Sequence, residues 1–324
     1  MQKLYLLFIL LIVSCGGGGN SSSIDSAPNN GSNNISNPIS ETCQEQEANI
    51  LRCDFKHQGL DRYYLIEPPH PEAEGQSSLI FNLHGYGSNA LDQMQYTGLN
   101  NYTNSKENNF ILIHPQGAPL NTALTSSASH WNSGAWTIGS TVDDVDFIDI
   151  IINLVSEKYN INVNRIYSTG MSNGGFMSYH LACNLSSKIA AIASVTGSMS
   201  KQTLESCNPE HPTPVLQIHG TLDGTVPFDG NSAIGMEPIE KVMTYWQEYN
   251  SCDVEPLISV TDFFELGSSV EHWQYFNCLN NVQVELYKID GMWHTWPQED
   301  RFGISASQKI WDFFNTYDLN GKIN

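Results

Sequence analysis

Apolar runs that stop at polar, glycine-containing loops recur along this chain. Three of them cover residues 78–83, 109–114 and 213–218, and a loop with at least one glycine follows each. A continuous apolar strand is typical of a parallel sheet that is covered on both faces. Because the sites of such sheets lie beyond the carboxyl ends of the strands, we expect these loops to carry the chemistry.

Helical periodicity lies between the apolar runs. Across residues 145–159 apolar side chains recur at helical spacing, and the acidic pair Asp143 and Asp144 before them suits a helix N-terminus. The other predicted elements are helices at 173–187, 238–249 and 305–317 and strands at 60–68, 165–169, 189–195, 271–277 and 282–289. The strand at 60–68 is expected at a sheet edge. This order predicts one large α/β domain whose central sheet is mostly parallel and flanked by helices.

The first 42 residues have a different character. Residues 1–15 contain one lysine, an apolar run too short to span a membrane, and Cys15. Their end resembles the lipobox of bacterial lipoproteins, which implies that Cys15 is acylated; an ordinary cleaved signal is the alternative. Residues 16–42 are mostly Gly, Ser, Asn and Pro and cannot bury enough apolar surface to order themselves. We expect an exported, lipid-anchored or secreted protein with a flexible tether before a domain at 43–324.

Apart from Cys15, the chain has six cysteines, an even number that favours disulfides in an exported protein. Fifteen pairings are formally open. Pairing of sequence neighbours gives Cys43–Cys53, Cys183–Cys207 and Cys252–Cys278. Metal binding is the competing interpretation, but the sequence has no C-x-x-C and no H-E-x-x-H spacing. We expect neither a metal nor an organic cofactor.

The net charge restricts the partners. The formal charge is −20, with only 14 lysines and arginines in 324 residues. Such a chain repels nucleic acids and other anionic polymers. We therefore expect a neutral substrate. Separately, we expect contact with a membrane only through the N-terminal lipid, and we expect a monomer.

The segment Gly170-Met171-Ser172-Asn173-Gly174 joins a predicted strand to a predicted helix. Glycines on both sides allow a sharp turn on which the Ser172 hydroxyl is pushed out of the fold. The backbone N–H of Asn173 then lies at a helix N-terminus and points to where an oxyanion would develop. A glycine-rich turn without chemistry is the alternative. We interpret Ser172 as a candidate nucleophile.

Two later strand-end loops supply an acid and a base. Asp223 follows the strand at 213–218, and His294 follows the strand at 282–289. The order serine, aspartate, histidine is that of α/β-hydrolases. In this interpretation His294 removes the Ser172 proton, and Asp223 orients the imidazole and stabilises its cation. An aspartate that only shapes a turn before glycine is the alternative for Asp223.

Two further loops are expected to border the site. Tyr86 lies in the loop after the strand at 78–83, and its backbone N–H is the candidate second oxyanion donor. Trp131 lies in the long loop at 118–142, and loops of that length are usually functional. We expect Trp131 to pack against a ring or an alkyl chain of a substrate, with a purely structural tryptophan as the equal alternative.

Taken together, these segments resemble the extracellular polyhydroxybutyrate depolymerase-like esterases, close to the feruloyl and acetylxylan esterases of the α/β-hydrolase superfamily. The segments that carry the resemblance are LHGYGSN at 83–89, HPQG at 114–117, DDVDFI at 143–148, GMSNGGFMSY at 170–179, HGTLDGTVPF at 219–228 and WHTWP at 293–297. The resemblance implies an α/β-hydrolase fold stapled by disulfides, the serine, aspartate and histidine named above, and an oxyanion hole at Tyr86 and Asn173. It also implies an aromatic cleft to which Trp131 and Trp296 contribute.

The resemblance gives an ordered set of expectations for function. The first is an exported serine esterase of the polyhydroxybutyrate depolymerase type, which acts on a polyester or oligoester. The alternative is a feruloyl or acetylxylan esterase that acts on plant polysaccharide, and a third is a catalytically silent surface binding lipoprotein. The chain departs from the family pattern at Asp146, where relatives usually have glycine, and we expect altered packing beneath the serine turn.

Overall fold

The computed structural model describes residues 39–102, 108–120, 127–263 and 268–323. The predicted signal peptide, the lipidation site at Cys15 and nearly all of the predicted tether therefore lie outside the described residues. Within the described ranges, none of the helices combines the length and the apolar character that crossing a membrane requires.

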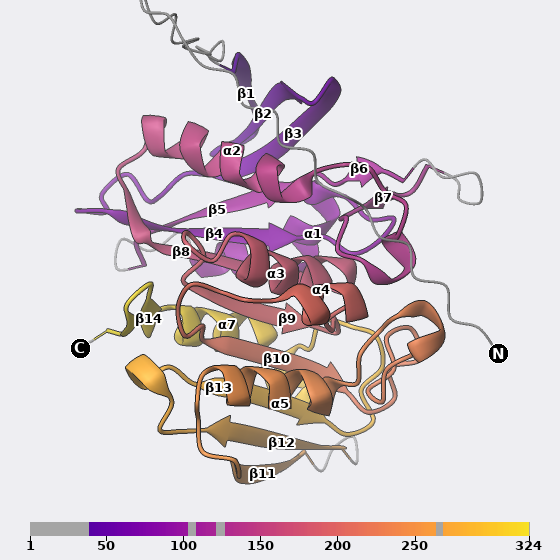
Figure 1. Cartoon of the computed structure of the whole chain (residues 1–324). Coiled ribbons are helices and arrows are strands. Elements are labelled where there is room, and N and C mark those ends of the chain that lie inside the picture. Colours follow the sequence, from indigo (N-terminus) through magenta and orange to yellow (C-terminus); the bar gives the residue numbers. More distant parts are fainter. Residues whose placement is uncertain (1–38, 103–107, 121–126, 264–267, 324) are drawn as a thin grey trace, which may run out of the picture. The chain divides into compact units, whose positions relative to one another are not determined.

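An eleven-stranded sheet runs through the described part of the chain (Figure 1). Its strands, in spatial order, are β1 (Glu41–Glu47), β2 (Ile50–His57), β3 (Leu60–Glu67), β5 (Phe110–Pro115), β4 (Ser77–Leu83), β8 (Ile161–Met171), β9 (Ala191–Val195), β10 (Val215–Gly220), β13 (Val284–Ile289), β12 (Ser268–Tyr275) and β11 (Leu257–Phe263). The six strands from β5 to β13 are parallel, and the outer pairs on both sides are antiparallel. This confirms the predicted mostly parallel sheet of an α/β-hydrolase fold.

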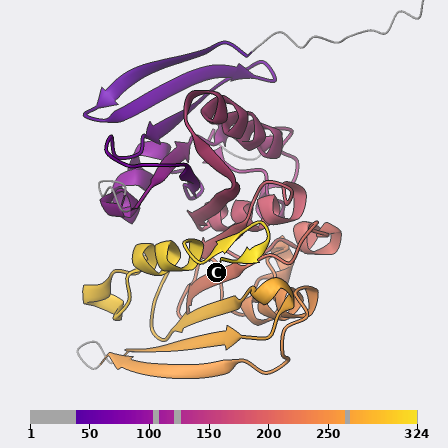
Figure 2. The same ribbon diagram turned by 90° about the vertical axis from the view of Figure 1, so that its left-hand side faces the viewer.

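Helices cover both faces of this sheet. Figures 1 and 2 show α2, α3 and α5 on one face and α1 and α7 on the other. The helices are α1 (Ala90–Thr97), α2 (Asp144–Lys158), α3 (Asn173–Asn184), α4 (Lys201–Ser206), α5 (Ile239–Tyr249), α6 (Glu299–Phe302) and α7 (Ala306–Phe314). Because both faces are covered, the whole of β4, β5, β9 and β10 is buried, as their continuous apolar sequences predict.

Helix α2 illustrates why the sequence forms these elements. The side chain of Asp143 caps the helix by accepting a hydrogen bond from the backbone N–H of Asp146. Phe147 and Ile151, at helical spacing, are buried against the sheet. The chain thus returns across the sheet and begins β8, in agreement with the predicted helix.

The edge of the sheet differs from the prediction. Strand β3 is not at the edge, because the hairpin of β1 and β2 pairs outside it. Strand β1 is almost wholly polar and β2 mixes polar and apolar residues, so the search for continuous apolar runs missed both. Strand β1 begins at Glu41, so the last two residues of the predicted tether belong to the sheet. The elements β11, α1 and α4 were also not predicted.

The long loop at 118–142 contains more structure than expected. Its described residues form the antiparallel pair β6 (Ala118–Pro119) and β7 (Ser129–His130) and the 3-10 helix η2 (Ala135–Thr137). The remaining small elements are η1 (Leu99–Tyr102), η3 (Ser232–Ile234), η4 (Leu279–Asn281), β14 (Tyr317–Asp318) and β15 (Gly321–Lys322).

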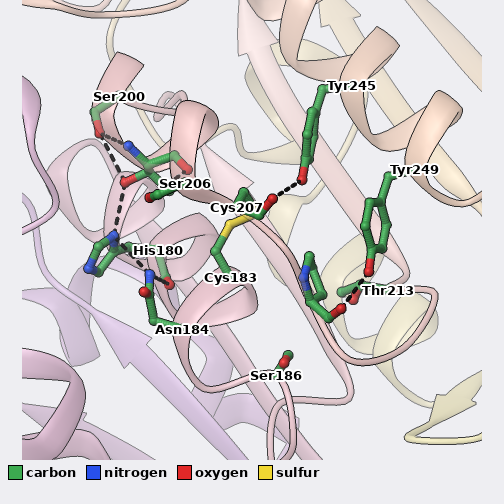
Figure 3. The surroundings of a disulfide bond; sticks show 12 residues. His180, Cys183, Asn184, Ser186, Ser200, Ser206, Cys207, Thr213, Tyr245 and Tyr249 are labelled. Carbon is green, nitrogen blue, oxygen red and sulfur yellow. Dashed lines mark hydrogen bonds between the residues drawn. A yellow bond between two sulfur atoms is a disulfide. The ribbon is translucent and has the colours of Figure 1, made fainter. Parts of the chain in front are cut away.

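The three disulfides formed by pairing sequence neighbours are all present, which confirms that pairing. Cys43 and Cys53 are opposite residues of β1 and β2. Cys183, near the end of α3, is bonded to Cys207, which directly follows α4 (Figure 3). In the same view the Tyr245 hydroxyl donates to the backbone carbonyl of Cys207 at 3.0 Å, so α5 also contacts this bridge. The third bridge joins the segment after α5 to the start of η4.

Candidate active site

Ser172 occupies a strained turn between β8 and α3. Its φ of 54° and ψ of −119° lie outside the regions that side-chain-bearing residues normally adopt. Gly170 and Gly174 make the turn sterically feasible: a Cβ on either would lie within 2.6 Å of the Leu83 carbonyl oxygen. The glycines flanking the serine therefore let the end of β4 pack directly against the turn, as the sequence pattern predicts.

Asp223 and His294 are joined by a hydrogen bond. The Nδ1–H of His294 donates to Oδ2 of Asp223 at 2.8 Å. The other carboxylate oxygen accepts the backbone N–H groups of Thr225 and Val226, each at 2.9 Å. Burial acts to raise the pKa of Asp223, but the hydrogen bond and the charge of His294 outweigh it, and the pKa is lower than usual. Asp223 is thus held as a carboxylate that fixes the tautomer of His294.

Close contact between two backbone segments brings this pair together. The segments follow the parallel neighbours β10 and β13. A Cβ on Gly220 would lie 2.0 Å from the carbonyl oxygen of Met292, so only glycine permits this approach. The same carbonyl accepts the backbone N–H of Leu222 at 3.1 Å. The acid and the base are therefore positioned by the packing of their loops rather than by their own bond alone.

Ser172, Asp223 and His294 follow β8, β10 and β13, three parallel strands of one sheet. Carboxyl ends of parallel strands meet at one edge, which brings the three predicted residues to the same edge of the sheet. Among the described residues no hydrogen bond joins the Ser172 hydroxyl to the His294 ring. Such contacts are often long without a substrate and shorten when one is bound.

The two candidate oxyanion donors flank Ser172. Asn173 is the first residue of α3, where backbone N–H groups point out of the helix end. Tyr86 follows Gly85, and a Cβ on Gly85 would lie 3.6 Å from the Cβ of Ser172. The loop that carries Tyr86 is thus packed against the serine turn, where the sequence predicts it.

A buried neutral histidine shapes the Tyr86 loop. His84 is fully buried, and burial lowers its pKa to about 4. Its Nδ1–H donates to the carbonyl of Gly85 at 2.8 Å, and its Nε2 accepts the backbone N–H of Gly117 at 2.9 Å. The neutral ring therefore ties the loop after β4 to the loop after β5. Sequence reasoning missed this role, although His84 directly follows an apolar strand.

The structure corrects the expectation for two tryptophans. Trp131 is 0% exposed and Trp296 is 1% exposed, so neither ring has a surface on which a substrate could pack. The Nε1–H of Trp131 donates to the carbonyl of His84 at 2.9 Å, and its backbone N–H donates to Oδ1 of Asn173 at 2.7 Å. Trp296 donates to Ser307 at 3.1 Å. Their assignment as substrate contacts is wrong, and Trp131 instead connects the two segments that carry the candidate oxyanion donors.

The two aspartates in the first turn of α2 have separate structural roles. Asp144 is buried, pairs with Arg62 at 2.7 Å and accepts the backbone N–H of Asn132 at 2.8 Å, which fixes the residue next to Trp131. Asp146 does not lie beneath the serine turn. It is exposed and bonded to the buried His57 of β2 at 2.8 Å, so the expected altered packing there is not seen.

A second buried histidine supports the acid loop. Burial lowers the pKa of His219, and the neutral ring donates from Nε2 to the carbonyl of Val226 at 2.8 Å. The same nitrogen lies 3.5 Å from Oδ2 of Asp223. Its Nδ1 accepts a hydrogen bond from the side-chain amide N–H of Gln217. The side-chain oxygen of Gln217 in turn accepts a hydrogen bond from the hydroxyl of Tyr179 on α3. A buried network therefore links the helix after Ser172 to the loop that carries Asp223.

The described residues contain one cluster with the proximity that a metal site needs, namely Glu41, Cys43 and Cys53. The two cysteines form a disulfide and offer no thiolate. The cluster also lies on the β1–β2 hairpin rather than at the carboxyl edge of the parallel strands.

The mostly parallel sheet, the strained serine turn after β8 and the Asp–His pair after the later strands define an α/β-hydrolase. The sequence also matches the model of the phospholipase/carboxylesterase family over residues 67–255, which is more than half of the chain. The chain belongs to this family.

Curated relatives and solved structures agree with this placement. Feruloyl esterase B of Piromyces equi is 29% identical over 197 residues, which cover 57% of this chain and 34% of that protein. The bifunctional acetylxylan esterase/xylanase XynS20E of Neocallimastix patriciarum is 23% identical over 272 residues, or 84% of this chain and 36% of that protein. The chain thus spans about a third of the length of these two relatives.

Among solved structures, the acetyl xylan esterase from Aspergillus awamori matches with a TM-score of 0.51 at 14% identity. The match covers 78% of this chain and 94% of that chain. A thermostable esterase matches with a TM-score of 0.55 at 15% identity, and the match covers 84% of this chain and 63% of that chain. At these identities the likeness shows the fold. The expected resemblance to feruloyl and acetylxylan esterases of the α/β-hydrolase superfamily is confirmed.

Proposed function

We propose that this protein is a serine esterase that hydrolyses feruloyl or acetyl esters carried by a polysaccharide. The observation that carries the proposal is the 2.8 Å bond between Asp223 and His294 at the sheet edge where Ser172 sits on its strained turn. The names of the relatives support the two acyl groups. The formal charge of −20 favours a neutral ester over an anionic one.

The geometry supports an acyl-enzyme mechanism. His294, oriented by Asp223, takes the proton of Ser172 as the hydroxyl oxygen attacks the ester carbonyl. The backbone N–H groups of Tyr86 and Asn173 stabilise the oxyanion, with about 3 kcal/mol from each donor. His294 then gives its proton to the leaving alcohol, and an activated water hydrolyses the acyl-enzyme. Each step uses side chains and backbone groups of this chain, so the mechanism requires no metal or organic cofactor.

The site of action is also part of the proposal. Three disulfides support an exported protein, because such bonds persist in oxidising compartments. We propose that residues 1–15 direct export, that Cys15 carries a lipid anchor and that residues 16–40 tether the enzyme to its membrane. A secreted form without the anchor remains the alternative, and the enzyme is expected to act as a monomer.

Polyhydroxybutyrate hydrolysis stays a prediction that rests on the resemblance of the sequence motifs alone. The same measurement tests it beside the proposed substrates. Turnover of acetylated xylan, methyl ferulate and amorphous polyhydroxybutyrate would be compared, and the preferred ester identifies the acyl group that the enzyme accepts.

The serine mechanism is tested with Ser172→Ala and a matched control, Ser206→Ala. Ser206 is an exposed residue of α4, and its hydroxyl donates to a backbone carbonyl of the same helix. We expect Ser172→Ala to lose all turnover and Ser206→Ala to keep the wild-type rate. Full activity in Ser172→Ala would overturn the mechanism. If the wild type cleaved none of the esters, a silent hydrolase fold that binds a ligand at the surface would replace the proposal.

A further inference from the structure

Three aromatic side chains form a row beside Ser172. The ring of Trp136 meets the ring of Phe176 edge-on, with centroids 5.1 Å apart, and meets the ring of Tyr86 edge-on at 6.3 Å. Phe176 lies one helical turn after Ser172, whose carbonyl accepts its backbone N–H at 3.0 Å. Tyr86 directly follows Gly85, which packs against the serine. The row therefore extends between the two segments that hold the candidate oxyanion donors.

The three rings differ in exposure. Phe176 is 1% exposed, whereas Tyr86 is 37% exposed and Trp136 is partly exposed. Phe176 is thus the buried support, and the other two rings keep surface that solvent can reach. In this they differ from Trp131 and Trp296, whose rings are buried.

The backbone that presents Trp136 is held in an unusual conformation. Ala135 has a φ of 52°, which residues with a side chain rarely adopt. Its backbone N–H donates to the side-chain carbonyl of Gln202 at 3.1 Å, and a Cβ on Gly134 would lie 2.4 Å from Oγ of Ser200. Strained backbone of this kind persists where the surroundings determine it, and it is common at ligand sites. Trp136 is therefore a positioned side chain rather than the tip of a free loop.

Helix α4 fixes this segment to the serine helix. The hydroxyl of Thr203 donates to the carbonyl of Ser133 at 3.3 Å, and the end of α4 is bonded to α3 through Cys183–Cys207 (Figure 3). Beneath Trp136, a small hydrophobic cluster separate from the main core consists of Ala135, Phe176, Val226 and Met236. It joins the serine helix to the acid loop, so the aromatic row has a rigid base next to the site.

We propose that the exposed ring surfaces of Tyr86 and Trp136 bind the aromatic ring of a hydroxycinnamoyl acyl group. This inference rests on the proposed esterase function and names the acyl group within it. Two edge-on rings on a rigid base suit a planar ring, which gains from stacked or edge-to-face contacts at such distances. An acetyl group has one methyl carbon beyond the carbonyl and is too small to cover either ring, so these side chains favour feruloyl esters over acetyl esters.

Two methyl esters with the same leaving group test the inference. We expect Trp136→Ala to lower kcat/KM for methyl ferulate roughly tenfold, mainly through KM, and to change kcat/KM for methyl acetate less than twofold. Trp136→Phe should recover most of the loss, because it restores a ring. Tyr86→Leu removes the other ring and keeps the backbone N–H, so it should lower kcat/KM for methyl ferulate more than kcat/KM for methyl acetate. Trp273→Ala, on β12, is the matched control and should leave both values unchanged.

A binding measurement separates this inference from the proposed function. Methyl ferulate is titrated into Ser172→Ala and into Ser172→Ala with Trp136→Ala by calorimetry, and the second protein should bind roughly tenfold more weakly. Equal binding of methyl ferulate by the two proteins would overturn the inference. It would also be overturned if Trp136→Ala and Trp136→Phe lost kcat/KM equally, and each lost as much for methyl acetate as for methyl ferulate. A wild type that cleaves methyl acetate but not methyl ferulate would overturn it as well while the esterase proposal stands. A wild type that cleaves neither ester but binds ferulate through Trp136 would refute only the esterase.

Discussion

Removal of the bridge between α3 and α4 is the perturbation whose magnitude the structure defines best. Cys183 and Cys207 are 24 residues apart in the sequence. In the chain-entropy model, losing a bridge of this span lowers the free energy of unfolding by about 3.5 kcal/mol, because the unfolded chain gains freedom. The folded state keeps other contacts of α4, including the bond between His180 and Thr203 at 2.9 Å. The double variant Cys183→Ser/Cys207→Ser should therefore fold and be less stable.

Urea unfolding of the wild type and the double variant measures the loss. With the slopes usual for globular proteins, a loss of about 3.5 kcal/mol moves the midpoint of unfolding down by roughly 1 M. Cys43→Ser/Cys53→Ser is the control, because its separation of 10 residues predicts a smaller loss of about 2.7 kcal/mol. A larger loss in that control than in the α3–α4 variant, or a loss below about 1 kcal/mol in the latter, would refute the entropic argument.

Three further outcomes are expected. Gly174→Ala should lower kcat at least 100-fold and also lower Tm, because the added Cβ would lie 2.1 Å from a backbone oxygen of β4. Gly224→Ala is the control and should keep the wild-type Tm, because a Cβ added there meets open space. Burial lowers the pKa of His84 to about 4, so the contribution of the neutral ring to the free energy of unfolding is complete above about pH 6.5 and falls by roughly 3 kcal/mol towards pH 4. Urea unfolding across that pH range measures this loss, and His84→Gln should make the free energy of unfolding depend less on pH. Asp223→Asn should lower kcat for methyl acetate by about 10⁴-fold with KM little changed, because the amide favours the wrong tautomer of His294; a loss confined to KM would contradict this role.

The sequence by itself determined the parts of the molecule that depend on short-range patterns. Continuous apolar runs predict buried parallel strands, and glycines around Ser172 predict the turn, because both follow from local sterics and from burial on two faces. The carboxyl ends of parallel strands share one edge, so the order of the loops was enough to bring Asp223 and His294 to the edge where Ser172 lies. Neighbour pairing of the cysteines succeeded for a similar reason, since each bridge spans at most 26 residues of the sequence.

Only the tertiary structure decided which aromatic rings face solvent. Trp131 and Trp136 lie five positions apart in one segment, yet the first is buried and the second is partly exposed. The burial of Trp131 depends on His84 and Asn173, which are 47 and 42 residues away in the sequence. The exposure of Trp136 depends on Gln202, which holds the backbone before it from 67 residues away. Contacts of such range are created by packing, and no local pattern of hydrophobic residues records them.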